Sequence, residues 1–455
     1  MPEEDLLLAA AIALAVMLRG CVGLWGYSGE GSPPMFGDYE AQRHWMEITI
    51  NLPPAAWYVQ GTDNDLQYWG IDYPPLSAHL SWLFGLIAGR LHPQLVELHS
   101  SRGFESGPTR AFMRNTVITC DAAIFFPAAL LCVRHGVPAG GPRLRLLLQL
   151  LTVPAFVLID HGHFQYNGVS LGLVLWAAYC CLASRPLAAC VAFSLALNFK
   201  QMCLYLAPAF FCYLLAGCLR QPTNLARVAA VGRLGVVVLG TFAACWAPLL
   251  LAGSDASLAA LRRIFPVERH LYEDKVANLW CSLSLLPFLK FKQILSISAL
   301  LRLTLASTLL ALLPPSLLLL RRPSRVGFLL SATACGLAFF LCSYQARPRT
   351  SEPRAMVASQ LMRVLGLRAV GTSAPVAVGL HPHPWCPWQV HEKHILLPLL
   401  PATLLAPRQP MLFTWCEPFP FGPPQAAPSR SRPPSVTGSP ARLGPLWVGR
   451  AAGLP

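Results

Sequence analysis

Charged side chains are scarce in this sequence. Asp, Glu, Lys and Arg make up only 12% of its 455 residues, whereas hydrophobic residues make up 54%. A soluble chain of this length would fold as several domains, each covered by a charged surface. The apolar runs are too long and too numerous for such domains. The sequence therefore excludes an ordinary soluble protein.

Paired cysteine motifs are missing as well. No Cys-x-x-Cys pair occurs among the 15 cysteines, most of which lie inside apolar runs. We interpret them as small buried hydrophobic residues rather than metal ligands or disulfide partners. The segment "VHEKH" at 390–394 lacks the His-Glu-x-x-His spacing. That spacing is the signature of zinc proteases, so this class is excluded too.

What the sequence contains instead is a series of apolar runs. A helix needs about 20 mostly apolar residues to cross the roughly 30 Å of hydrocarbon in a bilayer. We predict about ten spans, near residues 6–25, 116–133, 144–159, 169–183, 187–199, 202–219, 228–252, 279–291, 294–320 and 326–343. Residues 76–91 form a further short or re-entrant piece. Because acidic residues lead the first run, we prefer a retained span there to a signal sequence.

The net charge of +14 has an explanation that needs no nucleic acid. Part of it comes from the tail region after residue 345. Short loops between the predicted spans supply the rest, through Arg134, Arg143, Arg145, Arg220, Arg227, Arg321, Arg322 and Arg325. Such loops stay in the cytosol under the positive-inside rule. Residues 27–75 carry seven acidic residues and one Arg, so we expect them on the opposite, luminal side.

Ionisable residues gather in the loops rather than in the middle of the spans. This disfavours an ion-coupled transporter, whose working charges lie near the bilayer midplane. Three exceptions, Arg19, Asp121 and Lys200, lie within or at the ends of apolar runs. We interpret them as snorkelling side chains or buried pairs.

The chain changes character after residue 345. Residues 1–345 form the predicted multi-span region, and residues 346–389 contain no run long enough to span. A membrane-like pattern resumes at 390–406. Residues 407–455 are rich in Pro, Arg and Ser. We predict disorder for 346–389 and 407–455, because the Pro-rich tail buries too little apolar surface to offset its ordering entropy.

The segment "GDYEAQRHW" at 37–45 concentrates charge in a chain that has little. Helical spacing places four residues on one face: Glu40, Arg43, His44 and Glu47. Apolar residues occupy another face, so the pattern predicts an amphipathic helix at a membrane surface. Asp38 lies just before these residues, where a carboxylate often caps a helix. The alternative is a general base, and spacing alone favours the cap.

Three further loops have weaker signals. In "YWGIDYPPL" at 68–76, Asp72 and Tyr73 precede a stiff Pro-Pro pair, which suits either sugar binding or a rigid turn. Asp63-Asn64-Asp65 has the Asp-x-Asp pattern of a metal site, but three residues are a weak signal. In "DHGHFQYN" at 160–167, the two histidines favour local hydrogen bonds over a metal site, which would need more ligands.

A cationic cluster precedes the resumed apolar pattern. His391 and Lys393 lie in "QVHEKH" at 389–394. A cluster of this kind beside a span can bind a phosphate group.

Seven blocks together resemble one known family. They are "GDYEAQRHWMEIT", "YWGIDYPPL", "SRGFES", "DHGHFQYN", "LNFKQM", "FPVERHLYEDKVANLWC" and "VHEKHIL". In this order they resemble the endoplasmic-reticulum glucosyltransferases that use dolichyl phosphate glucose, in the GT-C superfamily. The likeness runs almost continuously from residue 37 to 345. It implies an all-α polytopic bundle of about ten transmembrane helices, with its active site in luminal loops and helices.

The resemblance also implies the chemistry. Glucose would pass with inversion from dolichyl phosphate glucose to a mannose 3-hydroxyl of lipid-linked Man9GlcNAc2, in a membrane, without metal or other cofactor. Such a transfer needs a base for the hydroxyl proton and cationic help for the departing phosphate. The family's base matches Asp38, and its phosphate contact matches His391, supported by Lys393. The other candidates for substrate binding are Glu40, Arg43, His44, Asp72 and Tyr73.

The chain departs from the family pattern in two places. Residues 346–389 separate Gln345 from Val390, which are adjacent words in the family, and the Pro-rich tail replaces further membrane helices. A displacement of about 1 Å can cost about 10²-fold in rate. Besides an active transferase, an impaired form of it and a transporter of lipid-linked sugars remain as alternatives.

Overall fold

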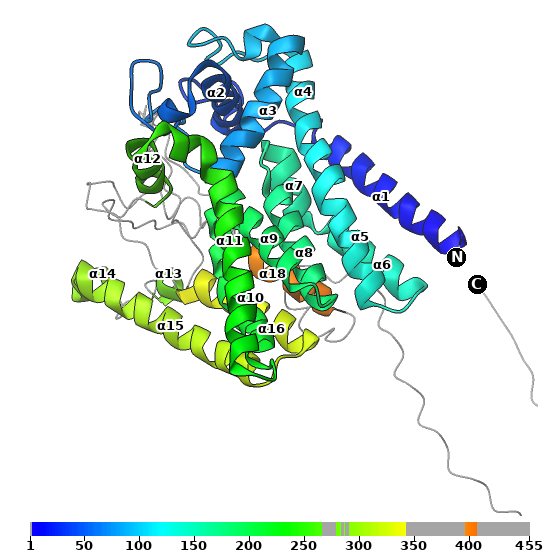
Figure 1. Ribbon diagram of the computed structural model, residues 1–455. Coiled ribbons are helices and arrows are strands. Elements are labelled where there is room, and N and C mark those ends of the chain that lie inside the picture. Colours follow the sequence, from blue (N-terminus) through cyan, green and yellow to red (C-terminus); the bar gives the residue numbers. More distant parts are fainter. Residues whose placement is uncertain (1, 266–278, 284–285, 287–290, 343–395, 407–455) are drawn as a thin grey trace, which may run out of the picture. The chain divides into compact units, whose positions relative to one another are not determined.

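The computed structural model describes residues 2–265, 279–283, 286, 291–342 and 396–406. Within these ranges every regular element is a helix (Figure 1). All of them belong to one compact unit, Met1–Cys416. The predicted phosphate contacts His391 and Lys393 lie outside the described residues. So do residues 346–389 and the predicted tail, 407–455.

The helices follow one another with short connections. They are α1 (Pro2–Val22), α2 (Gly37–Asn51), α3 (Pro75–Leu91), α4 (Gly107–Cys120), α5 (Phe126–Gly136), α6 (Gly141–Thr152), α7 (Pro154–His163), α8 (Asn167–Leu182), α9 (Pro186–Phe199), α10 (Ala207–Leu219), α11 (Asn224–Ala252), α12 (Ser254–Ile264), α13 (Leu279–Leu283), α14 (Phe291–Ile294), α15 (Ile297–Arg321), α16 (Arg325–Cys342) and α18 (Leu396–Leu405). A π-helical segment, Asp121–Phe125, joins α4 to α5.

The described residues confirm an all-α polytopic membrane protein. Seven helical stretches are long and apolar enough to cross a membrane: Glu3–Val22, Gly107–Gly136, Gly141–His163, Gln201–Leu219, Asn224–Ala252, Arg302–Arg321 and Arg325–Cys342. Three shorter apolar helices, α8, α9 and α18, join them. The predicted span at 279–291 lies partly outside the described residues, and the short piece at 76–91 forms α3.

The packed interior follows from the distribution of apolar residues. Helix α8 is apolar on nearly all sides, and a helix of that composition is buried by its neighbours. It packs closely against α9 and α5. Helix α11, by contrast, exposes large apolar side chains such as Val236 and Leu251, as expected of a helix that faces lipid. Ten of the twelve described cysteines are buried, which confirms their interpretation as small core residues.

Helix α18 belongs to the same interior although the numbering separates it from α16 by more than 50 residues. All but one of its ten side chains are buried. It packs against α16, where a side chain added at Gly336 would come within 3.0 Å of Pro398. The apolar pattern that resumes near residue 396 therefore forms part of the bundle.

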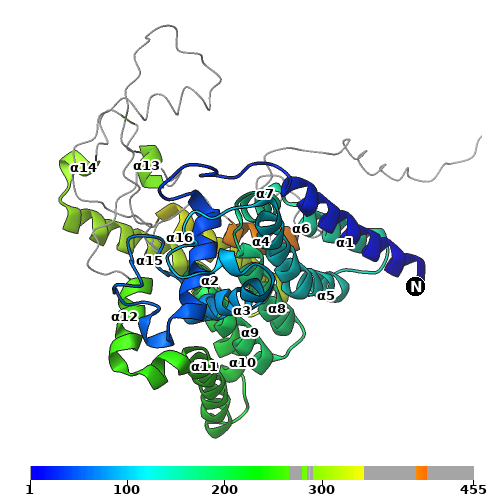
Figure 2. The same ribbon diagram turned by 90° about the horizontal axis from the view of Figure 1, so that it is seen from above.

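The basic turns and the acidic segment lie at opposite ends of the helices. Figure 1 places α2 and α3 at one end and the turns between α5 and α6, α10 and α11, and α15 and α16 at the other. At that second end the guanidinium of Arg220 donates to the carbonyl oxygen of Arg321, 3.1 Å away. Seen from above, α2 lies over the ends of the packed helices while α1 extends to the periphery (Figure 2). The predicted opposition of the two ends is therefore present.

A buried polar cluster ties α1 to the interior. Arg19 Nε donates to Asp121 Oδ2 at 2.7 Å, and its NH1 group donates to the Leu151 carbonyl oxygen at 2.8 Å. His161 Nε2 contacts the same carboxylate oxygen at 3.0 Å. Arg19 and Asp121 are 1% and 2% exposed. The buried-pair interpretation of these two residues is confirmed.

Helices α2 and α3 meet at a glycine. A Cβ atom at Gly85 of α3 would lie 2.6 Å from Ile50 Cγ2 and 2.9 Å from the Met46 carbonyl oxygen of α2. Real atoms do not approach this closely, so only glycine allows the two backbones to pack at this distance. The contact fixes α2 over the end of α3.

Candidate active site

The turn into α2 is built from residues in left-handed conformations. Phe36 precedes the helix with φ of 49° and forms no side-chain cap hydrogen bond. Gly37 follows with φ of 68°, and a Cβ there would collide with the Ser28 carbonyl oxygen. The prediction that Asp38 caps the helix is therefore wrong. Asp38 is the second residue of α2 and is partly exposed.

The prediction of a surface helix with a solvated charged face is also wrong. Glu40, Arg43, His44 and Glu47 are all completely buried. Segments distant in sequence cover them: Tyr68 donates its hydroxyl hydrogen to Glu40 at 2.8 Å, and the 95–101 region lies over Arg43. The helical spacing was right, but protein rather than water covers both faces of α2.

Arg43 is the centre of this buried network. Its Nε and NH2 groups donate to the two carboxylate oxygens of Glu40 at 2.7 and 2.6 Å, and NH2 also donates to Glu47 at 2.7 Å. Its NH1 group donates to the Leu95 carbonyl oxygen and to Ser101 Oγ. All five N–H donors of the guanidinium are thus used. Burial alone would lower the pKa of Arg43, but the two carboxylates raise it above its ordinary value.

Glu47 and His44 complete the network. His44 Nδ1 lies 3.0 Å from Glu47 Oε2, and the backbone N–H of His99 donates to Oε1 at 2.8 Å. Burial alone would raise the pKa of Glu47, but the His44 hydrogen bond and the Arg43 charge hold it at about 2. Burial lowers the pKa of His44. The imidazole is therefore neutral and donates from Nδ1 to Glu47.

This network makes stability depend on pH. The folded state holds the pKa of Glu47 at about 2, below its ordinary 4.5. Its ionisation therefore stabilises the fold above pH 4.5 by roughly 3 kcal/mol, and that contribution is lost as the pH falls toward about 2. The lowered pKa of His44 acts in the same direction from about pH 6.5 downward. We expect the difference in unfolding temperature between the wild type and Glu47→Gln to shrink from pH 7 to 3. A constant difference would contradict these assignments.

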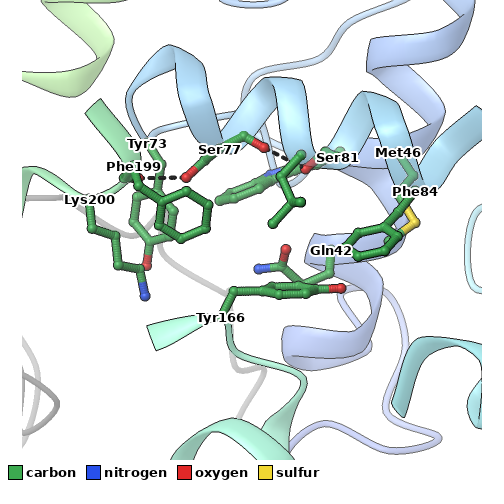
Figure 3. Close-up of a pocket in the computed structure, with 11 residues that line it drawn as sticks. Gln42, Met46, Tyr73, Ser77, Ser81, Phe84, Tyr166, Phe199 and Lys200 are labelled. Atoms are coloured by element: carbon green, nitrogen blue, oxygen red, sulfur yellow. Dashed lines mark hydrogen bonds between the residues drawn. The ribbon is translucent and has the colours of Figure 1, made fainter. Parts of the chain in front are cut away.

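The other face of α2 lines a pocket. Asp38 and Gln42 lie four residues apart and so share one helix face. The pocket beside that face is lined by Gln42, Trp45, Met46, Tyr73, Ser77, Leu80, Ser81, Phe84, Tyr166, Phe199 and Lys200. Figure 3 shows these side chains converging from α2, from α3 and from the chain around Tyr166 and Lys200. Helix α2 therefore presents its charged network on one side and this pocket on the other.

Tyr73 connects the pocket with the predicted carboxylates. Burial raises the pKa of Tyr73 well above its ordinary value, and the charges of Asp72 and then Asp38 raise it further. Both carboxylates therefore act on the pocket wall at close range. Of the predicted site residues, Asp38, Asp72 and Tyr73 lie together at the pocket. Glu40, Arg43 and His44 lie behind it in the network.

Lys200 is a buried cation of the pocket that the sequence analysis had noted only as an exception. It is 2% exposed. Its Nζ donates to Asn167 Oδ1 at 2.5 Å and lies 4.7 Å from the centre of the Tyr73 ring. Asn167 in turn donates to Asp160 Oδ1 at 2.6 Å. The chain Asp160–Asn167–Lys200 thus holds an ammonium group against the pocket.

The weaker metal signals resolve into local contacts. Asp63 Oδ1 lies 3.0 Å from His99 Nε2, and Asp65 accepts a backbone hydrogen bond from Gln67. His161 contacts Asp121, while His163 Nδ1 accepts from the Ser28 backbone N–H at 3.1 Å, which confirms local hydrogen bonding for both histidines. Across the part of the chain that the structure describes, no group of three or more His, Cys, Asp or Glu is placed to hold a metal.

Comparison with known proteins decides the family. Residues 11–349 match the model of the ALG6, ALG8 glycosyltransferase family. The chain belongs to this family. A chicken member named dolichyl pyrophosphate Man9GlcNAc2 alpha-1,3-glucosyltransferase is 40% identical over 414 residues, covering 91% of this chain and 72% of the relative. The rat protein of the same name is 40% identical, over 90% and 71% of the two chains.

A fruit-fly member of the ALG6, ALG8 family, with the same name marked as probable, is 45% identical over 79% of this chain and 75% of its own length. The family resemblance drawn from the polar blocks is therefore confirmed. The buried α2 network and the pocket both lie inside the matched range, 11–349. The site belongs to the part of the chain that defines the family.

Proposed function

We propose that this chain transfers glucose from dolichyl phosphate glucose to the terminal mannose of lipid-linked Man9GlcNAc2, forming an α-1,3 linkage. Family membership and the printed names of the relatives support the reaction class and the acceptor. Dolichyl phosphate glucose is the donor because a β-linked phosphate ester gives an α product in a single inverting step. An alternating pattern of buried and lipid-facing helices supports a multi-pass enzyme of the endoplasmic reticulum.

One observation carries the proposal. Asp38 is the partly exposed carboxylate of an otherwise buried helix, on the same face as Gln42, and its charge acts on Tyr73 in the pocket wall. The other two carboxylates of α2 are held by Arg43 and its partners. Asp38 is therefore the group on α2 that can meet a substrate hydroxyl as a base.

The proposed step balances with a single proton transfer. Asp38 accepts the proton of the mannose 3-hydroxyl while that oxygen attacks C1 of glucose. The bond between C1 and the phosphate oxygen breaks on the opposite side of the ring, and dolichyl phosphate leaves with the electron pair. Phosphate is a good leaving group, so no general acid is required. A cation near the phosphate stabilises the charge that develops there.

The Arg43 network gives α2 the rigidity that this base requires. Its five hydrogen bonds tie the helix to residues near 95 and 101 and to its own acids. A misplacement of about 1 Å can cost about 10²-fold in rate. Glu40, Arg43 and His44 therefore act in this proposal by positioning Asp38.

We further propose that the α2 end of the bundle faces the lumen. The Arg-bearing turns lie at the opposite end (Figure 1), and the positive-inside rule assigns such turns to the cytosol. The acceptor glycan and the donor head group would then both reach the pocket from the lumen.

The test is a transfer assay with the purified full chain in lipid. Dolichyl phosphate glucose and lipid-linked Man9GlcNAc2 are supplied, and mass spectrometry detects a gain of one hexose. A parallel form without residues 346–389 measures the effect of the added segment. Gain with neither form would refute the transfer reaction. Gain only after the deletion would assign the chain as an impaired form.

A further inference from the structure

The side chain of Gln42 is buried without a partner. It is only 5% exposed. No residue in the described ranges forms a hydrogen bond with its amide, although neighbouring polar side chains are paired throughout. In Figure 3 the amide of Gln42 points into the pocket, above the ring of Tyr166. A buried amide without hydrogen bonds lowers stability, so its retention needs another reason.

The surrounding polar groups are occupied elsewhere. Ser77 Oγ donates to the Phe199 carbonyl oxygen at 2.5 Å, and Ser81 Oγ donates to the Ser77 carbonyl oxygen at 3.1 Å. The hydroxyl of Tyr166 pairs with Thr116 at 2.7 Å. The walls they leave facing the pocket are largely aromatic and apolar. Gln42 thus supplies a free donor and acceptor in a pocket that also holds the ammonium of Lys200.

The chemistry of a primary amide matches a sugar ring. Its NH2 group offers two donors and its oxygen accepts, while each hydroxyl of a pyranose both donates and accepts. Aromatic walls suit the C–H faces of the ring, and few convergent polar groups fix orientation in such pockets. A phosphate alone would use only the donors and would leave the amide oxygen unpaired.

We propose that Gln42 is a specificity-determining residue whose amide hydrogen-bonds hydroxyls of the hexose at the reaction centre. The inference rests on the proposed glucosyl transfer. Gln42 lies one helical turn from Asp38, and side chains so spaced have Cβ atoms about 5–6 Å apart. The ring that it contacts is therefore one of the two reacting sugars, donor glucose or acceptor mannose. Both are pyranoses, and the experiment separates them.

The experiment compares the wild type with Gln42→Met, which keeps the length of the side chain but removes its hydrogen bonds. The matched control is Gln67→Met, at an exposed glutamine outside the pocket. Each full-length protein in lipid receives normal substrates, donors lacking one glucose hydroxyl, and acceptors whose terminal mannose lacks one hydroxyl other than the 3-hydroxyl. The rate constant kcat/KM is measured for each combination.

We expect one analogue to lower kcat/KM of the wild type and of Gln67→Met by at least about 10-fold, since a site built to bind a hydroxyl rejects its absence. Gln42→Met should lose a similar factor with normal substrates and nothing further with that analogue. A donor analogue with this behaviour identifies glucose, and an acceptor analogue identifies mannose. If Gln42→Met discriminates among all analogues as the wild type does, the proposal is wrong.

A second measurement separates recognition from folding and from the transfer reaction. Because the amide has no described partner, Gln42→Met should unfold at the wild-type temperature or above it. The rise in Tm on adding dolichyl phosphate glucose alone, or acceptor alone, reports binding without turnover. A wild type that transfers nothing refutes the proposed function. Equal shifts in Tm for both proteins with both ligands refute the role of Gln42.

Discussion

Replacing Asp38 by Asn should reduce glucosyl transfer by about 10²- to 10⁴-fold, the range that a lost general base typically costs. Asn has nearly the same shape as Asp but does not take up the hydroxyl proton. Asp38 neither caps α2 nor belongs to the Arg43 network, so the fold should lose little. The mass-spectrometric assay of hexose gain gives the rate, and thermal unfolding gives the stability.

The matched control for this experiment is Asp63→Asn. Asp63 lies in the same polar region but forms a half-exposed pair with His99, and such pairs contribute little. It should retain wild-type transfer. Wild-type rates in Asp38→Asn would refute the assignment of the base and direct attention to Asp72, the other carboxylate that acts on Tyr73.

Replacing Arg43 by Met should destabilise the protein by about 3–5 kcal/mol, the usual cost of breaking a buried ion pair from one side. Two carboxylates, Glu40 and Glu47, would remain fully buried without their cation. Thermal unfolding in lipid or mild detergent measures the loss. Arg262→Met, at an exposed position of α12, is the control and should unfold with the wild type.

A combined variant tests the cause of that loss. Adding Glu40→Gln and Glu47→Gln to Arg43→Met removes the buried negative charges, so part of the stability should return. No recovery would attribute the loss to packing rather than to charge. Wild-type stability of Arg43→Met itself would show that water reaches the network.

Sequence periodicity predicted α2 well but assigned its environment wrongly. The spacing of four charged residues places them on one helix face, and the structure has that helix at Gly37–Asn51. Periodicity records which residues share a face, not what covers it. The cover comes from residues near 68, 95 and 101, which are distant along the chain. The signal available within the helix was that Arg43 has an acid both three residues before and four residues after it.

The capping of α2 failed for a local reason. An Asp before a helical pattern usually begins the helix, but here Phe36 and Gly37 make the turn through positive φ angles. The collision of any Gly37 side chain with Ser28 depends on a contact nine residues back along the chain. That freed Asp38 for the pocket face.

Gln42 and Lys200 show what sequence reasoning overlooks in a site. Gln42 stands in the middle of the conspicuous block "GDYEAQRHW", but a neutral amide carries no charge to mark it. Its importance appears only when hydrogen-bond partners are counted in three dimensions. Lys200 was visible as a charge in an apolar run, but its neighbours Asn167 and Tyr73 come from other elements.

The buried pair of Arg19 and Asp121 has a consequence for how the protein is made. The two residues are 102 positions apart, and the other acceptor of Arg19, the Leu151 carbonyl, follows still later. Synthesis from the amino terminus completes α1 long before either partner exists. A lone arginine is costly inside a bilayer, so its guanidinium must stay at the water interface during that interval. The first helix to be synthesised is thus among the last to reach its final depth.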